Sequence, residues 1–375
     1  MNRILFVDDE PRGLEGIEEM LFGRPHAWEV VFASSAGEAV AAFEGRPFDV
    51  VFSDALMPDG ATLLSEVRTR WPGTIRVAIS GQPDPGQTEP AVPVAHELLT
   101  KPMSADVLLD TISRALALRR SCRSEALRCV AGRLDKLPQR PKTYERYLAR
   151  VHADASIDAI AAVIEEDPAL VAGLLRMVRS AFFATATPIE RVRDAIVRLG
   201  LAQTSDVVLA ICAFDGLTNE RVPYAEETFA HCTQVGQLAR RVAPPELRQR
   251  AFLAGLLHDI GHVVMGRSFP LVYRRMQGGA TEHREGSVAI EREHFGFDHS
   301  HCGAYLLRLW NLDEELAEAV DHHHAPLDLP PARRGLALTV WAVEMALAEE
   351  RERPDFDEAR VLERATAMIR NTEAE

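Results

Sequence analysis

Five side chains with the chemistry of a phosphoryl-transfer site stand directly after apolar segments in the first third of the chain: Asp8, Asp9, Asp54, Ser80 and Lys101. If those segments are strands of a parallel sheet, their carboxyl ends meet at one edge, where ligands bind. Carboxylates gathered there repel one another unless a hard cation lies between them, and Mg²⁺ suits such oxygen ligands. A carboxylate can accept a phosphoryl group while a metal ion and a lysine neutralise its charge. The five residues therefore predict a phosphoacceptor site that uses Mg²⁺.

The segments that must position these residues alternate between strand and helix patterns. The spacing predicts strands at 4–7, 28–32, 48–53, 75–79 and 94–98, with helices at 11–22, 36–44, 60–71 and 104–120. Continuous apolar strands that alternate with helices indicate a five-stranded parallel sheet covered on both faces. Segment 82–93 should hold one more helix, but its prolines predict a short or irregular one.

Residues 1–120 resemble the receiver domain of two-component systems. The acceptor loop 54–60 carries the resemblance, together with Ser80-Gly81 and Lys101-Pro102. The resemblance implies a flavodoxin-like α/β fold, Asp54 as phosphoacceptor and a histidine kinase as donor. It also implies Mg²⁺ on Asp8, Asp9, Asp54 and the backbone carbonyl of Leu56, with Ser80 and Lys101 contacting the phosphoryl group. Leu98 stands where receivers usually place a Tyr or Phe, so the usual route for transmitting phosphorylation is in doubt.

After residue 125 the strand patterns give way to helical spacing, which predicts an all-α half of the chain. The expected helices span 148–163, 168–180, 189–199, 204–214, 226–242, 246–258, 300–310, 314–322 and 334–350. The predicted organisation is a receiver domain over 1–120, a helical connector over 121–133 and a helical domain over 134–350. Residues 351–375 are charged and are expected to form a helix that frays into a tail.

The pair His258-Asp259 ends an apolar helix, as in the HD superfamily of metal-dependent phosphohydrolases. The wider pattern resembles the HDOD domain, a non-enzymatic relative used as a signalling output. It includes segments 134–138, 166–170, 194–200, 294–299 and 323–326 in consistent order. The chain departs from the family at Arg179, where an Asn is usual, and at His262, where a Lys is frequent.

A divalent transition metal could bind in this domain, and the candidate ligands are His231, His258, Asp259, His299, His323 and His324. Their order also resembles the HD-GYP cyclic-dinucleotide phosphodiesterases. Glu227 lies one helical turn before His231 and is expected to face the same way. The Gly-Tyr-Pro segment is missing, and helix 339–344 has no Asp where the superfamily places its last ligand.

Three interpretations of these histidines stay open. They are ordinary buried side chains, ligands of a metal that does no chemistry, or part of a receiver-gated phosphodiesterase for a cyclic dinucleotide or similar phosphoester. The missing ligand and the missing lysine favour the first two, so no catalytic residue is assigned.

The composition narrows the classes of partner. A net charge of −14 argues against nucleic-acid binding, which needs a basic face. No apolar run approaches the roughly 20 residues of a membrane span, the start does not resemble a signal peptide, and the five scattered cysteines are expected to be reduced. The sequence thus predicts a cytoplasmic response regulator. Phosphorylation of Asp54 would control an HDOD output that binds a protein partner or a second copy of the chain.

Overall fold

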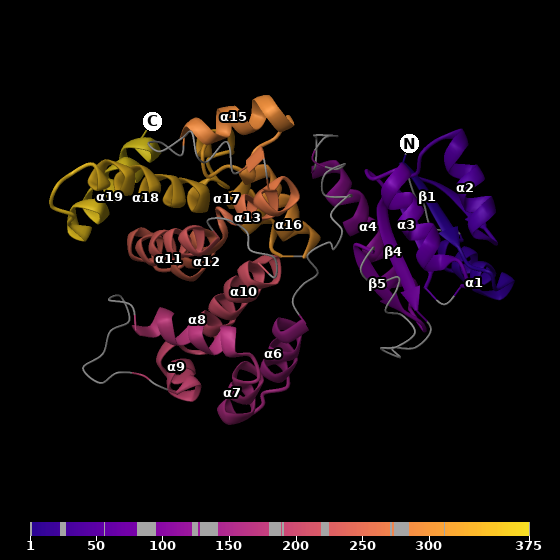
Figure 1. Ribbon diagram of the computed structural model, residues 1–375, viewed down its shortest axis with the longest axis horizontal. Coiled ribbons are helices and arrows are strands. Elements are labelled where there is room, and N and C mark those ends of the chain that lie inside the picture. The colour runs from indigo at the N-terminus through magenta and orange to yellow at the C-terminus, as the bar shows by residue number, and fades with distance from the viewer. Residues whose placement is uncertain are drawn as a thin grey trace. The chain divides into compact units, whose positions relative to one another are not determined.

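The structure of the chain is a computed structural model. It describes residues 2–22, 28–55, 57–80, 95–121, 127, 142–179, 189, 191–218, 225–270, 272–273, 285–310 and 312–374. The chain divides into two compact units, Met1–Gln139 and Arg140–Glu375. Figure 1 shows a sheet flanked by helices in the first unit and helices among the described residues of the second. Together the units confirm the predicted fold class of an α/β domain followed by an all-α domain.

The first unit is built on a five-stranded parallel sheet with strand order β2-β1-β3-β4-β5. Its elements are β1 (Asn2–Val7), α1 (Pro11–Leu21), β2 (Trp28–Ala33), α2 (Ala36–Gly45), β3 (Val50–Asp54), α3 (Gly60–Arg70), β4 (Ile75–Ser80), β5 (Glu97–Thr100) and α4 (Ala105–Ser121). The strand order reverses between β1 and β3, and this switch point is where open α/β sheets bind ligands.

The sheet is buried on both faces, which explains why its strands are continuous apolar runs. Every residue of β3 and β4 is buried. On one face, Leu5 and Val51 pack with Phe43 of α2 and Leu63 of α3. On the other, the ring of Phe6 stacks on Phe52 with centroids 4.6 Å apart. Burial on both faces fixes the strand register, and the register fixes which side chains end each strand.

The second unit packs helices against one another. They are α6 (Lys142–His152), α7 (Ile157–Glu165), α8 (Pro168–Arg179), α9 (Val192–Leu199), α10 (Leu201–Thr218), α11 (Ala225–Val242), α12 (Arg248–Leu257), α13 (Ile260–Ser268), α15 (Glu285–Phe295), α16 (His299–Leu309), α17 (Glu314–Asp321), the 3₁₀ helix η2 (Pro326–Asp328), α18 (Gly335–Arg351) and α19 (Glu358–Ala374). α11, α12 and α18 lie side by side, as do α13, α16 and α17 (Figure 1). α13 and α15 were not predicted from the spacing.

The prediction of one continuous helix over 148–163 is wrong. α6 ends at His152, and Asp154 has a positive φ of 48°, a backbone conformation that ends helices. Ser156 then caps the next helix, its hydroxyl accepting a hydrogen bond from the Ala159 amide at 3.3 Å. The apolar spacing continues through the break because both helices bury their faces in the same unit.

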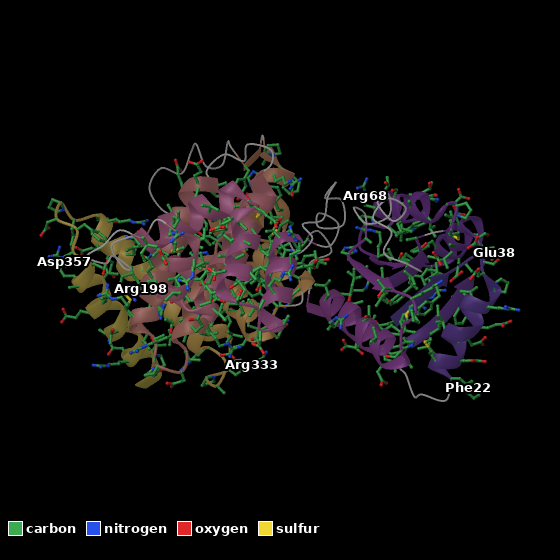
Figure 2. All side chains as sticks on the ribbon, turned by 90° about the horizontal axis from the view of Figure 1, so that it is seen from below. Phe22, Glu38, Arg68, Arg198, Arg333 and Asp357 are labelled. Carbon is green, nitrogen blue, oxygen red and sulfur yellow. The ribbon has the colours of Figure 1, made fainter. Side chains whose placement is uncertain are left out.

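The last helix, α19, packs on α18 and does not project as a loose segment. Val361 and Ala365 are buried, and Arg364 pairs with Glu349 of α18 at 2.9 Å. Figure 2 labels exposed side chains of both units, among them Phe22 and Glu38 in the first and Arg198 in the second.

Several predictions fall wholly or partly outside the described residues. They concern the fourth helix over 82–93 and most of the connector over 121–133. In the part of the chain that is described, no single helix is long and apolar enough to cross a bilayer. α9 with the start of α10 passes that test only as a pair bent by 119°.

A half-buried carboxylate on α10 makes the stability of the helical unit depend on pH. Burial raises the pKa of Asp206 to about 7, against the opposing effects of a hydrogen bond from Gln249 and the charge of Arg240. The folded state therefore holds a proton up to about pH 7, whereas the unfolded chain releases it near its ordinary value of 3.8. Between these values the folded state loses stability as the pH rises.

Asp206→Asn should remove this loss. Relative to wild type, the variant should gain up to about 4 kcal/mol in free energy of unfolding above pH 7, and little near pH 4. Urea denaturation between pH 4 and 8, followed by helical circular dichroism, measures the difference. The exposed Asp328→Asn is the control and should give a difference that does not vary with pH. A pH-independent difference for Asp206→Asn would contradict the assignment.

Candidate functional site

The lysine predicted at the receiver site joins two acidic side chains. Lys101 Nζ lies 2.7 Å from Asp8 Oδ2 and 2.6 Å from Asp54 Oδ2. Both carboxylates are buried, at 2% and 8% exposure. The Lys101 amide donates to the Ser80 carbonyl at 2.7 Å, which holds the lysine over the sheet edge. The Lys101-Pro102 bond that follows is cis. The edge thus brings together two carboxylates and a cation.

The charge of Lys101 is maintained by its partners. Burial alone would lower the pKa of Lys101, but the hydrogen bonds and charges of Asp54 and Asp8 outweigh this effect and raise it. The ammonium group therefore stays protonated and neutralises part of the charge on the two carboxylates. A positive group in this place can also stabilise charge on a transferred phosphoryl group.

The remaining residues predicted for the receiver site are Ser80, Asp9 and Leu56. Ser80 is buried at the end of β4, next to β3 and its Asp54. Asp9 is exposed beside Asp8, and the Leu56 carbonyl lies outside the described residues. The described sets of three or more metal-binding side chains that converge within 4.8 Å all belong to the helical unit.

At the centre of the helical unit lies Asp259, which is 1% exposed and follows α12 directly after His258. Its two carboxylate oxygens face different groups of histidines. Oδ2 lies 3.5 Å from Nε2 of His258 and 3.9 Å from Nε2 of His231. Oδ1 lies 3.3 Å from Nε2 of His299 and 3.7 Å from Nε2 of His323. Asp259 therefore connects two polar clusters inside one helical core.

The cluster on the Oδ2 side contains His231, His258, Asp259 and Glu344, whose ligand atoms converge within 4.8 Å. Glu344 Oε1 lies 3.2 Å from Nε2 of His258 and 3.4 Å from Nε2 of His231. Ligands about 2.1 Å from a tetrahedral metal are about 3.4 Å from one another. The spacing and the mixture of imidazole and carboxylate donors therefore fit a divalent transition metal such as Zn²⁺.

Backbone carbonyls orient two of these imidazoles. Nδ1 of His258 lies 2.8 Å from the Gly255 carbonyl, and Nδ1 of His323 lies 2.7 Å from the Val320 carbonyl. Each Nδ1–H must donate to its carbonyl, which leaves Nε2 directed into the centre. Both Nε2 atoms are buried and have no hydrogen-bond partner among the described residues. This is the orientation that metal-ligating histidines adopt.

Sequence reasoning missed Glu344. The expected Asp was absent from helix 339–344, but the glutamate at its end reaches the centre with one more methylene. Glu227 lies on α11 one turn before the buried His231, but it is exposed and does not belong to the buried centre. The side chain of Arg179 lies outside the described residues.

The cluster on the Oδ1 side contains His262 and the remaining predicted histidines. Nε2 of His299 lies 2.9 Å from Nε2 of His324, and Nε2 of His262 lies 3.7 Å from Asp259 Oδ1. Glu291 of α15 was also missed: it is fully buried and accepts a hydrogen bond from Nδ1 of His299 at 2.8 Å. No sequence signal identified Glu291, because its role depends on how α15 packs against α16.

The buried carboxylates set the charge states of these histidines. Burial would lower the pKa of His299, but Glu291 and Asp259 raise it to about 10. Burial would likewise lower the pKa of His258, but Asp259, Cys232 and Glu344 raise it well above its ordinary value. Burial lowers the pKa of His323, and the nearby His324 lowers it further. The raised pKa values of His258 and His299 show that the carboxylates favour positive charge on both sides of Asp259.

Close backbone contacts bring the ligand-bearing helices together. A Cβ on Gly261 would lie 1.9 Å from the backbone oxygen of His299, so α13 can approach α16 only with glycine there. A Cβ on Gly255 would lie 2.5 Å from the Gly236 Cα, and this contact joins α11 to α12. The two approaches place His299 beside Asp259 and His231 beside His258.

Comparison with known families agrees with this architecture. The HDOD domain profile matches residues 137–326, which is half of the chain. The chain belongs to the HDOD domain family. The response regulator receiver domain profile matches residues 4–113, so this HDOD protein also carries a receiver domain.

Three relatives illustrate the similarity of this HDOD protein to known proteins. An uncharacterized protein of Treponema pallidum is 26% identical over 222 residues, which cover 58% of this chain and 43% of that protein. The hydrogenase transcriptional regulatory protein HoxA of Cupriavidus necator is 35% identical over 117 residues, covering 30% of this chain and 24% of HoxA. The chain thus spans less than half the length of either relative.

The structure of a putative phosphohydrolase from Shewanella amazonensis matches with a TM-score of 0.51 at 22% identity. That match covers 66% of this chain and 95% of the other, and it shows a shared fold.

Gly261→Ala tests whether the close approach of α13 to α16 builds the centre. The added methyl group meets backbone atoms that cannot rotate away, so the variant should lose about 1–3 kcal/mol or more in free energy of unfolding. Gly37→Ala on α2 is the control, because nothing lies within 4 Å of its added Cβ. Chemical denaturation followed by circular dichroism compares the two. Equal stabilities would contradict the close approach.

Proposed function

We propose that this chain is a response regulator in which phosphorylation of Asp54 controls an HDOD output domain that binds a protein partner. The contact of Lys101 Nζ with both Asp54 and Asp8, at 2.6 and 2.7 Å, supports the phosphoacceptor role most directly. The donor would be a histidine kinase of a two-component system, in keeping with the receiver domain at residues 4–113.

The proposed reaction transfers a phosphoryl group from a phosphohistidine to Asp54. A carboxylate oxygen of Asp54 forms the new P–O bond as the P–N bond breaks, and the imidazole leaves with the bonding electron pair. Lys101 neutralises charge on the phosphoryl oxygens, with the buried Ser80 at the adjacent strand end. Asp8, Asp9 and Asp54, with the Leu56 carbonyl, would hold Mg²⁺, which when bound would neutralise further phosphoryl charge.

A phosphodonor experiment tests the acceptor. Acetyl phosphate with Mg²⁺ should label the wild-type chain and fail to label Asp54→Asn, because the amide oxygen does not form a stable phosphoryl adduct. Asp59→Asn in the same loop is the matched control and should label normally, since Asp59 is exposed. Intact-protein mass spectrometry measures the adduct. Equal labelling of Asp54→Asn would overturn the assignment.

Hydrogen exchange in the same samples tests whether phosphorylation of Asp54 alters the HDOD output domain. Phosphorylation of the wild type should change amide protection in helices of unit 140–375, and the same treatment of Asp54→Asn should not. A pull-down with treated and untreated protein would then show whether a partner depends on phosphorylation. An unchanged exchange pattern in the helical unit of the labelled wild type would contradict control by the receiver.

We also propose that the HDOD domain holds a divalent transition metal. Two observations support this: the converging ligands His231, His258, Asp259 and Glu344, and the buried Nε2 atoms of His258 and His323. Such an ion, when bound, would lower the pKa of a water ligand and could stabilise charge on a phosphoester. His262 stands at the position where related hydrolases carry a lysine, which favours binding over hydrolysis. The phosphodiesterase therefore remains the second candidate function.

Metal analysis separates these alternatives. The purified wild type should retain a divalent metal after dialysis, and the double variant His258→Ala with Asp259→Ala should lose it. The exposed His294→Ala is the control and should keep the metal. Hydrolysis of a cyclic dinucleotide by the wild type that disappears in the double variant would establish the phosphodiesterase. A wild type without metal would overturn both the metal centre and the enzyme.

A further inference from the structure

His262 departs from its family and lies against the Oδ1 side of Asp259. It stands on α13, one turn after Asp259, and is 8% exposed. Its Nε2 lies 3.7 Å from Asp259 Oδ1, and its ring stacks on His299 with centroids 3.7 Å apart at 19°. Asp259, His262 and His299 offer ligand atoms that converge within 4.8 Å. A histidine here can donate a lone pair to a metal, which a protonated lysine cannot do.

A buried hydrogen-bond relay fixes which nitrogen of His262 carries the proton. The Tyr273 hydroxyl donates to Glu291 Oε1 at 3.2 Å and also contacts Nδ1 of His262. A hydroxyl has a single proton, so while it donates to Glu291 it can only accept from His262. Nδ1 of His262 is therefore the donor, and its Nε2 lone pair faces Asp259.

The same glutamate orients the neighbouring imidazole. Glu291 Oε2 accepts hydrogen bonds from the His299 amide at 2.9 Å and from Nδ1 of His299 at 2.8 Å. When Nδ1 of His299 donates, its Nε2 is directed at Asp259 Oδ1, 3.3 Å away. Glu291 thus acts on two rings at once, through Tyr273 on one side and directly on the other. It is a positioning residue, since it reaches Asp259 only through these imidazoles.

We propose that His262 is a ligand of a second divalent transition-metal ion, held with His299 on the Oδ1 side of Asp259. This inference rests on the proposed metal centre, whose ligands His231, His258 and Glu344 lie on the Oδ2 side. Asp259 would offer one carboxylate oxygen to each ion. Three buried or nearly buried carboxylates, Asp259, Glu291 and Glu344, supply negative charge that two divalent ions would compensate. Imidazole and carboxylate donors suit Co²⁺, Zn²⁺ or Fe²⁺.

Co²⁺ binding to the metal-free full-length chain tests the proposal. After desalting, the wild type should hold about two equivalents of Co²⁺ and His262→Ala about one, with the affinity of the remaining ion unchanged. His294→Ala is the matched control on α15 and should hold about two equivalents, because its side chain is exposed. Elemental analysis gives the number of ions, and titration followed by visible absorption gives the affinities.

The proposed positioning role of Glu291 is tested by the affinity of the chain for the second ion. Glu291→Gln should weaken binding of that ion by roughly 10- to 100-fold while leaving the first ion unchanged, an effect that general destabilisation would not produce. Glu293→Gln, exposed on the same helix, should change neither affinity. Tyr273→Phe preserves the packing and should weaken the second ion in the same direction, so the relay remains testable if Glu291→Gln does not fold.

The outcomes separate this inference from the metal centre on which it rests. A wild type that binds about one Co²⁺ per chain would overturn the second site and leave the first in place. A wild type that binds none would overturn both. Two ions retained in His262→Ala with unchanged affinities would show that His262 is not a ligand and would also overturn the inference.

Discussion

The helical unit depends on one buried carboxylate shared between two sets of imidazoles. Asp259 is 1% exposed. A buried carboxylate is stable only when positively charged groups or hydrogen-bond donors lie close to it. Its two oxygens face different histidines, which come from helices distant in sequence. The glycine contacts at Gly261 and Gly255 exist because those helices must approach closely enough to surround it.

Much of this arrangement could be predicted from the sequence, because the residues involved stand in recognisable local patterns. Strand ends located Asp8, Asp54 and Lys101, and the structure joins these three at one sheet edge. The His258-Asp259 pair likewise marked the helical centre. Glu344 and Glu291 could not be predicted, since a glutamate reaches a site only through the packing of its whole helix. Glu227 is exposed although it lies one helical turn before the buried His231.

The two units gather different kinds of side chain at their sites. The receiver edge combines two carboxylates with a lysine, a set of groups that can accept and hold a phosphoryl group. The helical centre combines imidazoles with carboxylates, donors that suit a softer cation. His262 stands where related hydrolases are expected to carry a lysine, and in the proposed second site it would supply a lone pair instead. The same departure that argues against hydrolysis would thereby enlarge the set of metal ligands, as expected of a domain that binds.

We propose that Asp259 holds metal ions through both of its carboxylate oxygens. Anomalous diffraction from crystals of the full-length chain grown with Co²⁺, recorded at the cobalt edge, tests this proposal. We expect anomalous peaks about 2.1 Å from the Asp259 oxygens, one beside His258 and Glu344 and one beside His262 and His299. Peaks confined to other parts of the chain would contradict the proposal.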